Sequence, residues 1–215
     1  MTDLIGRAEL GEMFAQAAAC IRREHQHLTA LDSIGGDGDH GTTMLRAAEQ
    51  MERGIEESST ASLTDLLKSV GWKVLGVDGG ASSALFGTFF AGMGDVQLFS
   101  QDAMNCHDLG RAFQAGLRAM SRQTKAGPGD KTMMDALVPA VTAVTAAANA
   151  GKSISDALDD AALAAQLGAE STKDLVARHG RARSLGERTR GYPDAGATSV
   201  ALLFRGFSAG LRREL

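Results

Sequence analysis

The sequence has few residues that form covalent or metal cross-links, and this scarcity excludes several classes of protein. Its two cysteines, Cys20 and Cys106, belong to no CxxC pair and have no histidine at the spacing of a zinc site. We therefore expect neither a structural zinc ion nor a disulfide. Only three prolines occur in 215 residues and alanine is abundant, a composition that favours helix.

The sequence also lacks a long apolar run and an excess of positive charge. No stretch reaches the roughly 18 uninterrupted apolar residues of a membrane helix. The N-terminal residues are charged and amphipathic, without the apolar core and cleavage site of a signal peptide. A net charge of -4 provides no basic field for nucleic acid or an anionic membrane. We expect a cytoplasmic protein that binds neither, and any anionic ligand must be held locally.

What the sequence does contain is apolar residues at helical spacing along most of its length. The hydrophobic content of 44% and a length of 215 residues are enough for one hydrophobic core, so we predict a single domain, residues 1–215. The one β-leaning stretch, Val96 to Phe99, is short. Helical patterns occupy 10–21 and 63–75, and about 105–122, 132–150, 154–178 and 197–212. The predicted fold is all-α, an antiparallel bundle of about eight helices.

Glycines gather in four segments between the predicted helices: 35–41, 78–83, 127–132 and 180–196. Successive helices of an up-and-down bundle alternate in direction, so alternate loops lie at the same end. We therefore expect several of these segments to form one rim. Ser153 and Asp156 have the spacing of a helix start.

The first glycine segment carries three carboxylates, Asp32, Asp37 and Asp39, in a loop too rich in glycine to be helical. Hard oxygen ligands on a flexible loop suit Mg²⁺ or Ca²⁺. An EF-hand is excluded, because the positions where that motif needs Gly and Glu are Thr42 and Ala48. What remains is Mg²⁺ with phosphate oxygens completing its shell. The alternative is a simple turn in which Asp39 caps the next helix.

The second segment, Asp78 to Leu85, is a glycine turn that leads into a helix whose first turn is made of small residues. Bare backbone amides at a helix N-terminus bind anions, and missing side chains allow a phosphate or a flat ring to approach. The alternative is a tight turn between helices packed through small residues, and the short motif taken alone favours this alternative.

The third segment, Gly127 to Asp135, superficially resembles a P-loop. Asp130 stands where a glycine precedes the lysine of that motif, and no strand is predicted before it, so we reject a Walker A site. A helix that opens with Lys131 and Thr132 can still offer amide and hydroxyl donors to a ligand. The alternative is a solvent-facing helix start capped by Asp130.

The fourth segment, Arg178 to Ser199, is the longest non-periodic stretch and is dense in arginine. Arginine forks match phosphate geometry, and a long irregular loop in a compact domain is more often functional than not. Arginines near a helix C-terminus are also favoured by the helix dipole. We therefore expect one arginine to contact a phosphate and the others to be solvated.

His40 differs from the other histidines because it lies beside three carboxylates. We assign it to the ligand pocket rather than to acid-base chemistry, since phosphoryl transfer depends mainly on charge neutralisation and alignment. The remaining four are expected at the surface or at helix caps: His25, His27, His107 and His179.

In this order along the chain, LDSIGGDGDHGTTM, VDGGASSALFGTFF, GPGDKTMMDALVPA and GRARSLGERTRGYPDAGATS resemble the nucleotide-binding L subunit of dihydroxyacetone kinases. The resemblance covers most of the chain. It implies a closed antiparallel barrel of about eight helices, with ADP or ATP and a pair of Mg²⁺ ions at its rim. The implied magnesium ligands are Asp32, Asp37 and Asp39. The implied nucleotide-lining residues are His40, Gly41, Thr42, Thr43, Ala81, Ser82, Met133, Arg181, Gly196, Ala197 and Thr198.

The resemblance also implies that the activity is shared between chains. In this family the L subunit passes a phosphoryl group to dihydroxyacetone that is bound covalently to a histidine of a separate K subunit. One branch keeps ADP bound and is recharged by a phosphotransferase-system phosphocarrier, while the other exchanges ATP; the sequence does not distinguish them. We expect a free-standing kinase subunit of the glycerone kinase type, active only with its K-type partner.

Two other functions stay open: the nucleotide-binding component of a fatty-acid-kinase-like system, and a nucleotide-sensing regulatory partner of a transcription factor. The sequence also departs from the family pattern near the nucleotide and the partner-facing surface. Ser83-Ala84 stands where Gly-Pro is usual, Thr43 where Asn is common, and Arg183-Ser184 where Ser-Tyr is common. The acceptor sugar therefore stays open, and a related ketose such as erythrulose is an alternative.

Overall fold

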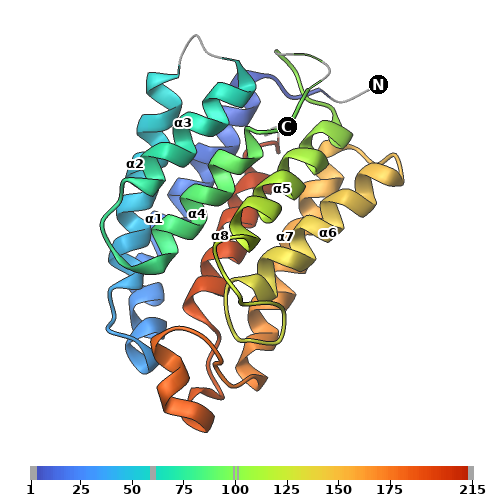
Figure 1. Cartoon of the computed structure of the whole chain (residues 1–215). Helices are drawn as coiled ribbons and strands as arrows, with labels where there is room; N and C mark the ends of the chain where they lie inside the picture. The colour runs from blue at the N-terminus through green and yellow to red at the C-terminus, as the bar shows by residue number, and fades with distance from the viewer. Residues whose placement is uncertain (1–3, 59–61, 99, 101, 213–215) are drawn as a thin grey trace.

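The computed structural model describes residues 4–58, 62–98, 100 and 102–212, and regular structure in these residues is helical (Figure 1). The α-helices are α1 (Arg7–Gly35), α2 (His40–Glu57), α3 (Leu63–Leu75), α4 (Gly80–Met93), α5 (Cys106–Ser121), α6 (Met134–Asn149), α7 (Ile154–Ser171) and α8 (Ala195–Ala209). Two 3-10 segments, η1 (Thr172–Asp174) and η2 (Arg181–Thr189), lie between α7 and α8. The prediction of an all-α fold of about eight helices is confirmed.

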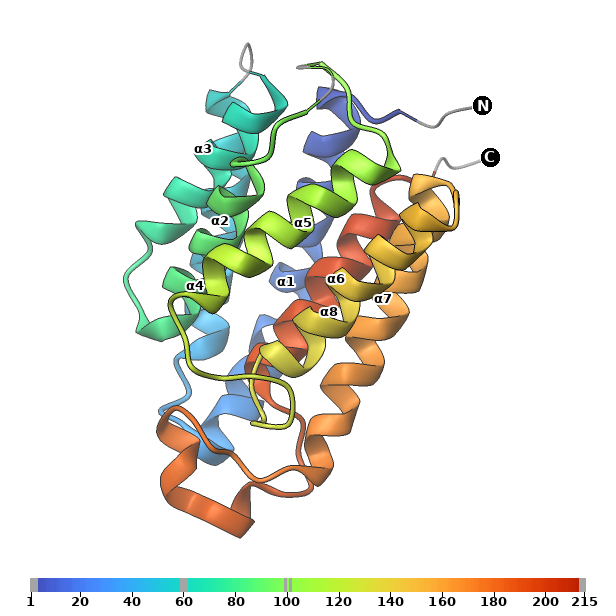
Figure 2. The same ribbon diagram turned by 45° about the vertical axis from the view of Figure 1, so that its right-hand side comes forward.

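The eight α-helices close into a ring. Each helix packs against the next along the chain, and α8 packs against α1. Figures 1 and 2 show successive helices running in opposite directions. The α1–α8 contact depends on Gly206, where a Cβ atom would lie only 2.3 Å from the Cα atom of Ala17. The expected closed antiparallel barrel is therefore the observed architecture.

Phenylalanine side chains fill the interior of the ring. Phe113 from α5 and Phe204 from α8 have ring centroids 5.2 Å apart, and Phe14 from α1 lies 5.2 Å from Phe207. All four side chains are fully buried. Such aromatic pairs contribute about 0.5–1.5 kcal/mol each beyond the burial of their area. The barrel interior is a packed core, which leaves the ends of the barrel as the places for a ligand.

The helix connections alternate between the two ends of the barrel. Connections 36–39, 76–79, 122–133 and 172–194, with the helix ends that they join, form the lower end in Figure 1, which we call the rim. The described residues of connections 58–62, 94–105 and 150–153 lie at the opposite end, which we call the far end. Each of the four glycine-rich segments of the sequence reaches the rim, as expected for alternate loops.

The structure corrects two predictions of secondary structure. The helix predicted over 154–178 is too long, because α7 ends at Ser171 and the carbonyl of Thr172 accepts a hydrogen bond from the Lys131 ammonium at 2.5 Å. The β-leaning stretch from Val96 forms no strand where it is described, and Phe99 lies outside the described residues. Ser153 is confirmed as a helix cap. Among the described helices, none combines the length and apolar character needed to cross a membrane.

Candidate functional site

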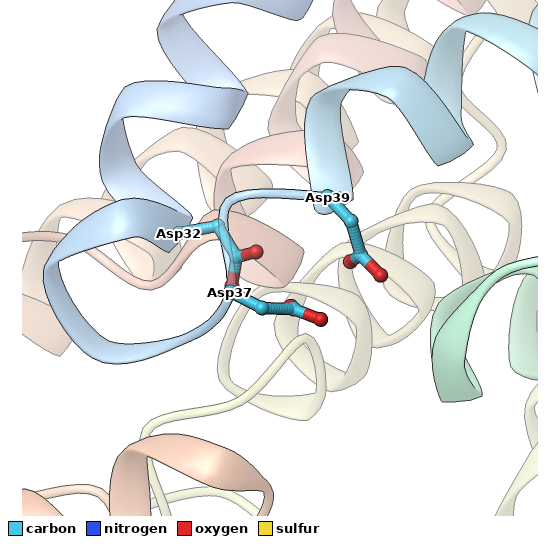
Figure 3. Close-up of side chains that lie close together, drawn as sticks. All are labelled: Asp32, Asp37 and Asp39. Carbon is cyan, nitrogen blue, oxygen red and sulfur yellow. The ribbon is translucent and has the colours of Figure 1, made fainter.

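Three aspartates meet where α1 ends and α2 begins. Asp32 lies in the last turn of α1, and Asp37 and Asp39 follow in the connection. Figure 3 shows the three carboxylates close together, and one oxygen from each lies within 4.8 Å of the others. Clustered carboxylate oxygens are the donor set that Mg²⁺ prefers. The structure therefore brings together the three residues that the sequence predicts as metal ligands.

Glycines allow the chain to fold back onto Asp32. A Cβ atom at Gly36 would lie 2.2 Å from Oδ1 of Asp32, so no side chain fits there. Gly38 has a φ of 74°, in the left-handed region that favours glycine. Asp39 occupies the N-cap position of α2, but its side chain makes no capping hydrogen bond. The alternative of a simple turn capped by Asp39 therefore does not describe this loop.

Arg181 brings positive charge to the acidic loop. Its guanidinium, carried by η2, pairs with the Asp37 carboxylate and lies 3.7 Å from Oδ2 of Asp39. The Arg181 side chain is 59% exposed, so solvent screens these pairs and they contribute little to stability. The one arginine expected to contact a phosphate thus lies beside the predicted metal ligands.

A cavity of about 430 Å³ opens beside the acidic loop and is lined by residues from all four rim connections or the helix ends that they join. This volume is within the range of small-molecule sites. Eight predicted site residues line it: Asp32, Asp39, His40, Ala81, Ser82, Met133, Arg181 and Gly196. The other six predicted residues do not line it: Asp37, Gly41, Thr42, Thr43, Ala197 and Thr198. Most of the predicted site is therefore assembled around one cavity.

Two of the predicted residues outside the lining shape the rim through packing. A Cβ atom at Gly41 would lie 2.0 Å from the carbonyl oxygen of His25, so glycine allows α2 to approach α1. Thr43 is buried, and its Oγ1 atom lies where a Cβ atom at Gly79 would stand. Nucleotide contact by these two residues stays a prediction.

Helix starts at the rim differ in how they are capped. The first N–H of α2, from His40, donates to Oδ2 of Asp32 at 3.3 Å, and the first N–H of α6, from Met134, donates to Oγ1 of Thr132 at 3.2 Å. At α2, α4 and α6 no side chain of the N-cap residue accepts a first-turn N–H. The α4 start is also bare, because Gly79 and Gly80 have φ values of 137° and 51° and no side chains. At α8, by contrast, Oδ2 of Asp194 accepts the N–H of Ala197 at 2.8 Å. Uncapped N–H groups at the positive end of a helix dipole favour an anion.

His40 joins three helices beneath the cavity. Its Nδ1 atom lies 3.1 Å from Oγ of Ser82 in α4, and its Nε2 atom lies 2.8 Å from Oγ of Ser199 in α8. Burial lowers the pKa of His40, which outweighs the opposing influence of Asp32. The imidazole is therefore neutral near pH 7 and holds two hydroxyls in place, in agreement with a role in the pocket rather than as a charged acid.

The sequence did not predict the buried position of Lys131. The alternative of a solvent-facing helix start is wrong, because Lys131 is 6% exposed and α6 begins three residues later, at Met134. Its Nζ atom donates to the carbonyls of Thr172 at 2.5 Å and Tyr192 at 2.6 Å. Both acceptors are backbone atoms far away in the sequence, so no side-chain motif signals these contacts.

The sequence also did not predict that His179 and several apolar residues line the cavity. His179 was expected at the surface or a cap, and its side chain is 38% exposed; it also lines the cavity, with Nε2 3.3 Å from Oδ2 of Asp130. A hydrogen bond from the Gly127 N–H lowers the pKa of Asp130, with help from the nearby His179 and Arg178. Apolar and small residues complete the lining: Leu85, Thr124, Ala126 and Met134. Their only signal in the sequence is proximity to the glycine segments.

Known proteins resemble this chain over most of its length. The family model described as the DAK2 domain matches residues 34–209. The ADP-binding subunit DhaL of PEP-dependent dihydroxyacetone kinase 1 from Listeria innocua is 36% identical, with 86% of each chain covered. The corresponding Escherichia coli subunit is 33% identical, covering 94% of this chain and 95% of the relative. L-erythrulose 1-kinase from Mycolicibacterium smegmatis is 38% identical over 94% of this chain and 35% of its own.

A solved structure shares the fold. The dihydroxyacetone kinase from C. freundii, in complex with AMP-PNP and Mg²⁺, aligns with a TM-score of 0.72 and 27% sequence identity. The alignment covers 97% of this chain, which spans about a third (35%) of the C. freundii chain. The likeness therefore extends to one part of a longer kinase.

Proposed function

The chain belongs to the DAK2 domain family, and from that premise we propose that it is the nucleotide- and magnesium-binding, phosphoryl-donor subunit of a dihydroxyacetone kinase. One observation carries this proposal: three carboxylates within 4.8 Å of one another stand beside a cavity of about 430 Å³ that the bare glycine start of α4 also lines. The acceptor sugar would be held on a separate K-type subunit. We further infer that residues 1–215 form one domain, which the closure of α8 on α1 supports.

The donor set of the acidic loop fits Mg²⁺. Asp32, Asp37 and Asp39 would hold the metal through hard carboxylate oxygens, and we infer a pair of ions. Bound magnesium supplies neutralisation of phosphate charge, which is the main requirement of phosphoryl transfer. The glycine-rich start of α4 offers backbone N–H groups, and Arg181 adds a guanidinium fork that matches phosphate oxygens.

The cavity lining includes polar and apolar groups, which suit the two parts of a nucleotide. Arg181, Gly80 and Ser82 offer donors suited to phosphate, while Leu85 and Met133 offer apolar contact suited to a base. Neutral His40 keeps Ser82 in position from below. We retain the remaining sequence predictions as proposed nucleotide contacts: Gly41, Thr42, Thr43, Ala81, Gly196, Ala197 and Thr198.

Similarity supports a specific donor route. Relatives that this chain matches along most of their length are named as ADP-binding subunits of PEP-dependent kinases. We therefore propose that ADP stays bound and is recharged by a phosphotransferase-system phosphocarrier in the cytoplasm. The 38% identity to an L-erythrulose 1-kinase makes a related ketose the second candidate acceptor.

The test is nucleotide retention after purification in magnesium. Denaturing release should yield ADP from the wild-type protein and none from Asp37→Ala, because that variant loses a metal ligand. Asp95→Ala is the matched control, since Asp95 is 70% exposed and pairs with Lys68 at the far end. Wild-type protein that binds no nucleotide, or Asp37→Ala protein that retains it, would overturn the proposal.

Transfer assays separate the proposed function from its alternatives. With a K-type subunit and dihydroxyacetone, the recharged protein should phosphorylate the sugar, and without that subunit it should not. Transfer that requires a lipid carrier instead would indicate a fatty-acid-kinase-like system. Nucleotide retention without transfer to either acceptor would indicate a regulatory role.

A further inference from the structure

Lys131 is a buried cation that binds both ends of one loop. Its Nζ atom donates to the carbonyl of Thr172 at 2.5 Å and to the carbonyl of Tyr192 at 2.6 Å. These residues bracket the segment 173–191, which contains η2 and Arg181. One buried side chain therefore joins both ends of the loop that carries Arg181 to the connection 122–133.

The backbone of Lys131 is held in an unusual conformation. Its φ of 58° makes it the one non-glycine residue with positive φ among the described residues. Such a conformation persists where the surrounding structure fixes it, and it occurs preferentially at functional sites. A glycine would adopt it without strain, so the lysine side chain supplies something that glycine cannot.

Other contacts bind the loop to the same place. The Gly191 N–H donates to the Lys173 carbonyl at 2.8 Å, which closes the loop just inside the Lys131 contacts. The Arg178 N–H donates to the carbonyl of Asp130, the neighbour of Lys131, at 3.1 Å. From this anchored base the loop extends to Arg181, whose guanidinium pairs with the Asp37 carboxylate.

We propose that Lys131 is a positioning residue for the nucleotide site, because its ammonium closes the loop 173–191 and thereby places Arg181 opposite the acidic loop. This inference rests on the proposed nucleotide function. Lys131 acts through the two carbonyls and Arg181, and not through contact with the reacting atoms. Loss of the ammonium leaves the loop ends joined to each other, by the Gly191–Lys173 and Asp194–Thr172 hydrogen bonds, but removes their bonds to Lys131, and Arg181 then samples positions away from the phosphate.

The first test is a double-mutant cycle on ADP affinity in the presence of magnesium. Lys131→Met keeps the length of the side chain and removes the donor, so it should weaken ADP binding by up to about tenfold, and by no more than Arg181→Ala does, because Lys131 acts through Arg181. In an Arg181→Ala background the same change should have little further effect, because residues that act through one another are not additive. Lys125→Met, at an exposed lysine of the same connection, is the control.

Hydrogen exchange separates local loosening from loss of the fold. Lys131→Met should speed amide exchange in 173–191 and leave α2, α3 and α4 unchanged. If Lys131→Met does not fold, Gly191→Ala tests the same loop, because Gly191 has a φ of 90° and no atom stands where its Cβ would go. Gly151→Ala, with a φ of 71° and the same open space at the far end, is its matched control.

The outcomes are distinct from those of the proposed function. Wild-type protein that binds no nucleotide overturns the function itself. Wild-type binding with unchanged affinity in Lys131→Met, or losses that add fully to those of Arg181→Ala, would overturn the positioning role alone. If only Gly191→Ala and Gly151→Ala can be measured, the positioning role is also overturned when the two variants have equal ADP affinity and equal amide exchange in 173–191.

Discussion

The same helices form both ends of the barrel, but the two ends differ in how the backbone N–H groups of their helix starts are capped. At the far end, α3, α5 and α7 each begin with a side-chain cap, in which Ser62, Asn105 and Ser153 accept the N–H three residues later. At the rim, the N-cap residues of α2, α4 and α6 provide no such cap, although Asp32 accepts the first N–H of α2 and Thr132 that of α6. The three far-end starts are capped by their own N-cap residues, whereas at the rim the glycine start of α4 has no capping side chain and is left open to a ligand.

Backbone conformation separates the two ends in the same way. Among the described residues eight glycines have positive φ, and seven of them lie at the rim: Gly38, Gly79, Gly80, Gly129, Gly180, Gly186 and Gly191. The eighth, Gly151, lies at the far end. Unusual backbone is concentrated where a ligand must approach the chain closely. The comparison predicts that changes at the rim alter binding and that changes at the far end alter stability.

The largest effect is expected from Asp39→Ala. ADP affinity in magnesium should fall roughly a hundredfold or more, as ligand-sphere losses of this kind do. The free energy of unfolding should stay equal or rise, because the substitution removes one of three carboxylates that repel one another. Calorimetry and chemical denaturation measure the two quantities. A destabilised protein with unchanged ADP affinity would break the comparison.

The next effect concerns pH and Asp194. Burial raises the pKa of Asp194 to about 6, above the value of about 3.9 in an unfolded chain. The folded protein therefore binds a proton on Asp194 more tightly than the unfolded chain does. The resulting stabilisation of the fold is complete below about pH 4 and is lost as the pH rises through about 6. The nearby Lys131 lowers the pKa of Asp194, and Asp135 raises it.

Asp194→Asn removes the titration and keeps an acceptor for the Ala197 N–H. We compare the free energy of unfolding of the wild type with that of Asp194→Asn. The wild-type value minus the variant value should fall by about 1–3 kcal/mol between pH 4 and pH 7. Urea denaturation at several pH values measures the difference. A difference that is flat or rises over this range would contradict the account.

Arg181→Ala should weaken ADP binding by about tenfold, which corresponds to about 1.4 kcal/mol, because a guanidinium beside the phosphates is lost. Stability should change little, since the Arg181 ion pairs are exposed. Arg212→Ala is the matched control at the far end, where Arg212 pairs with Asp159 at 3.0 Å. Equal effects of the two substitutions on ADP affinity would remove the distinction between the ends.

The smallest effect is expected from Ser153→Ala at the far end. Loss of its hydrogen bond to the Asp156 N–H should lower the free energy of unfolding by about 1 kcal/mol. ADP affinity should not change. Thermal denaturation and calorimetry test both statements, and a marked loss of affinity would show that the far end is coupled to the site.

Much of the fold could be predicted because helical periodicity is a local property. The apolar repeats anticipated most helices, and Ser153 marked a helix start that the structure confirms. The same reasoning carried α7 too far, to residue 178, because an apolar spacing continues after Ser171. What ends the helix there includes a contact from Lys131, which is distant in the sequence.

The clustering of the acidic residues could be predicted because the three aspartates lie within one short segment. The remainder could not, because it depends on pairs that only the closed barrel brings together. His40 contacts Ser199 in α8, 159 residues later, and Lys131 binds backbone carbonyls that no residue type marks. Side chains that satisfy distant polar atoms are therefore the part of this site that a single sequence leaves hidden.

The most direct test of the central claim is calorimetric titration of the nucleotide-free protein with ADP, in magnesium and again in excess chelator. The account predicts tight binding in magnesium and a large loss of affinity in chelator, because the aspartates and the phosphates share the metal. Equal affinity under both conditions, or no binding in either, would contradict it.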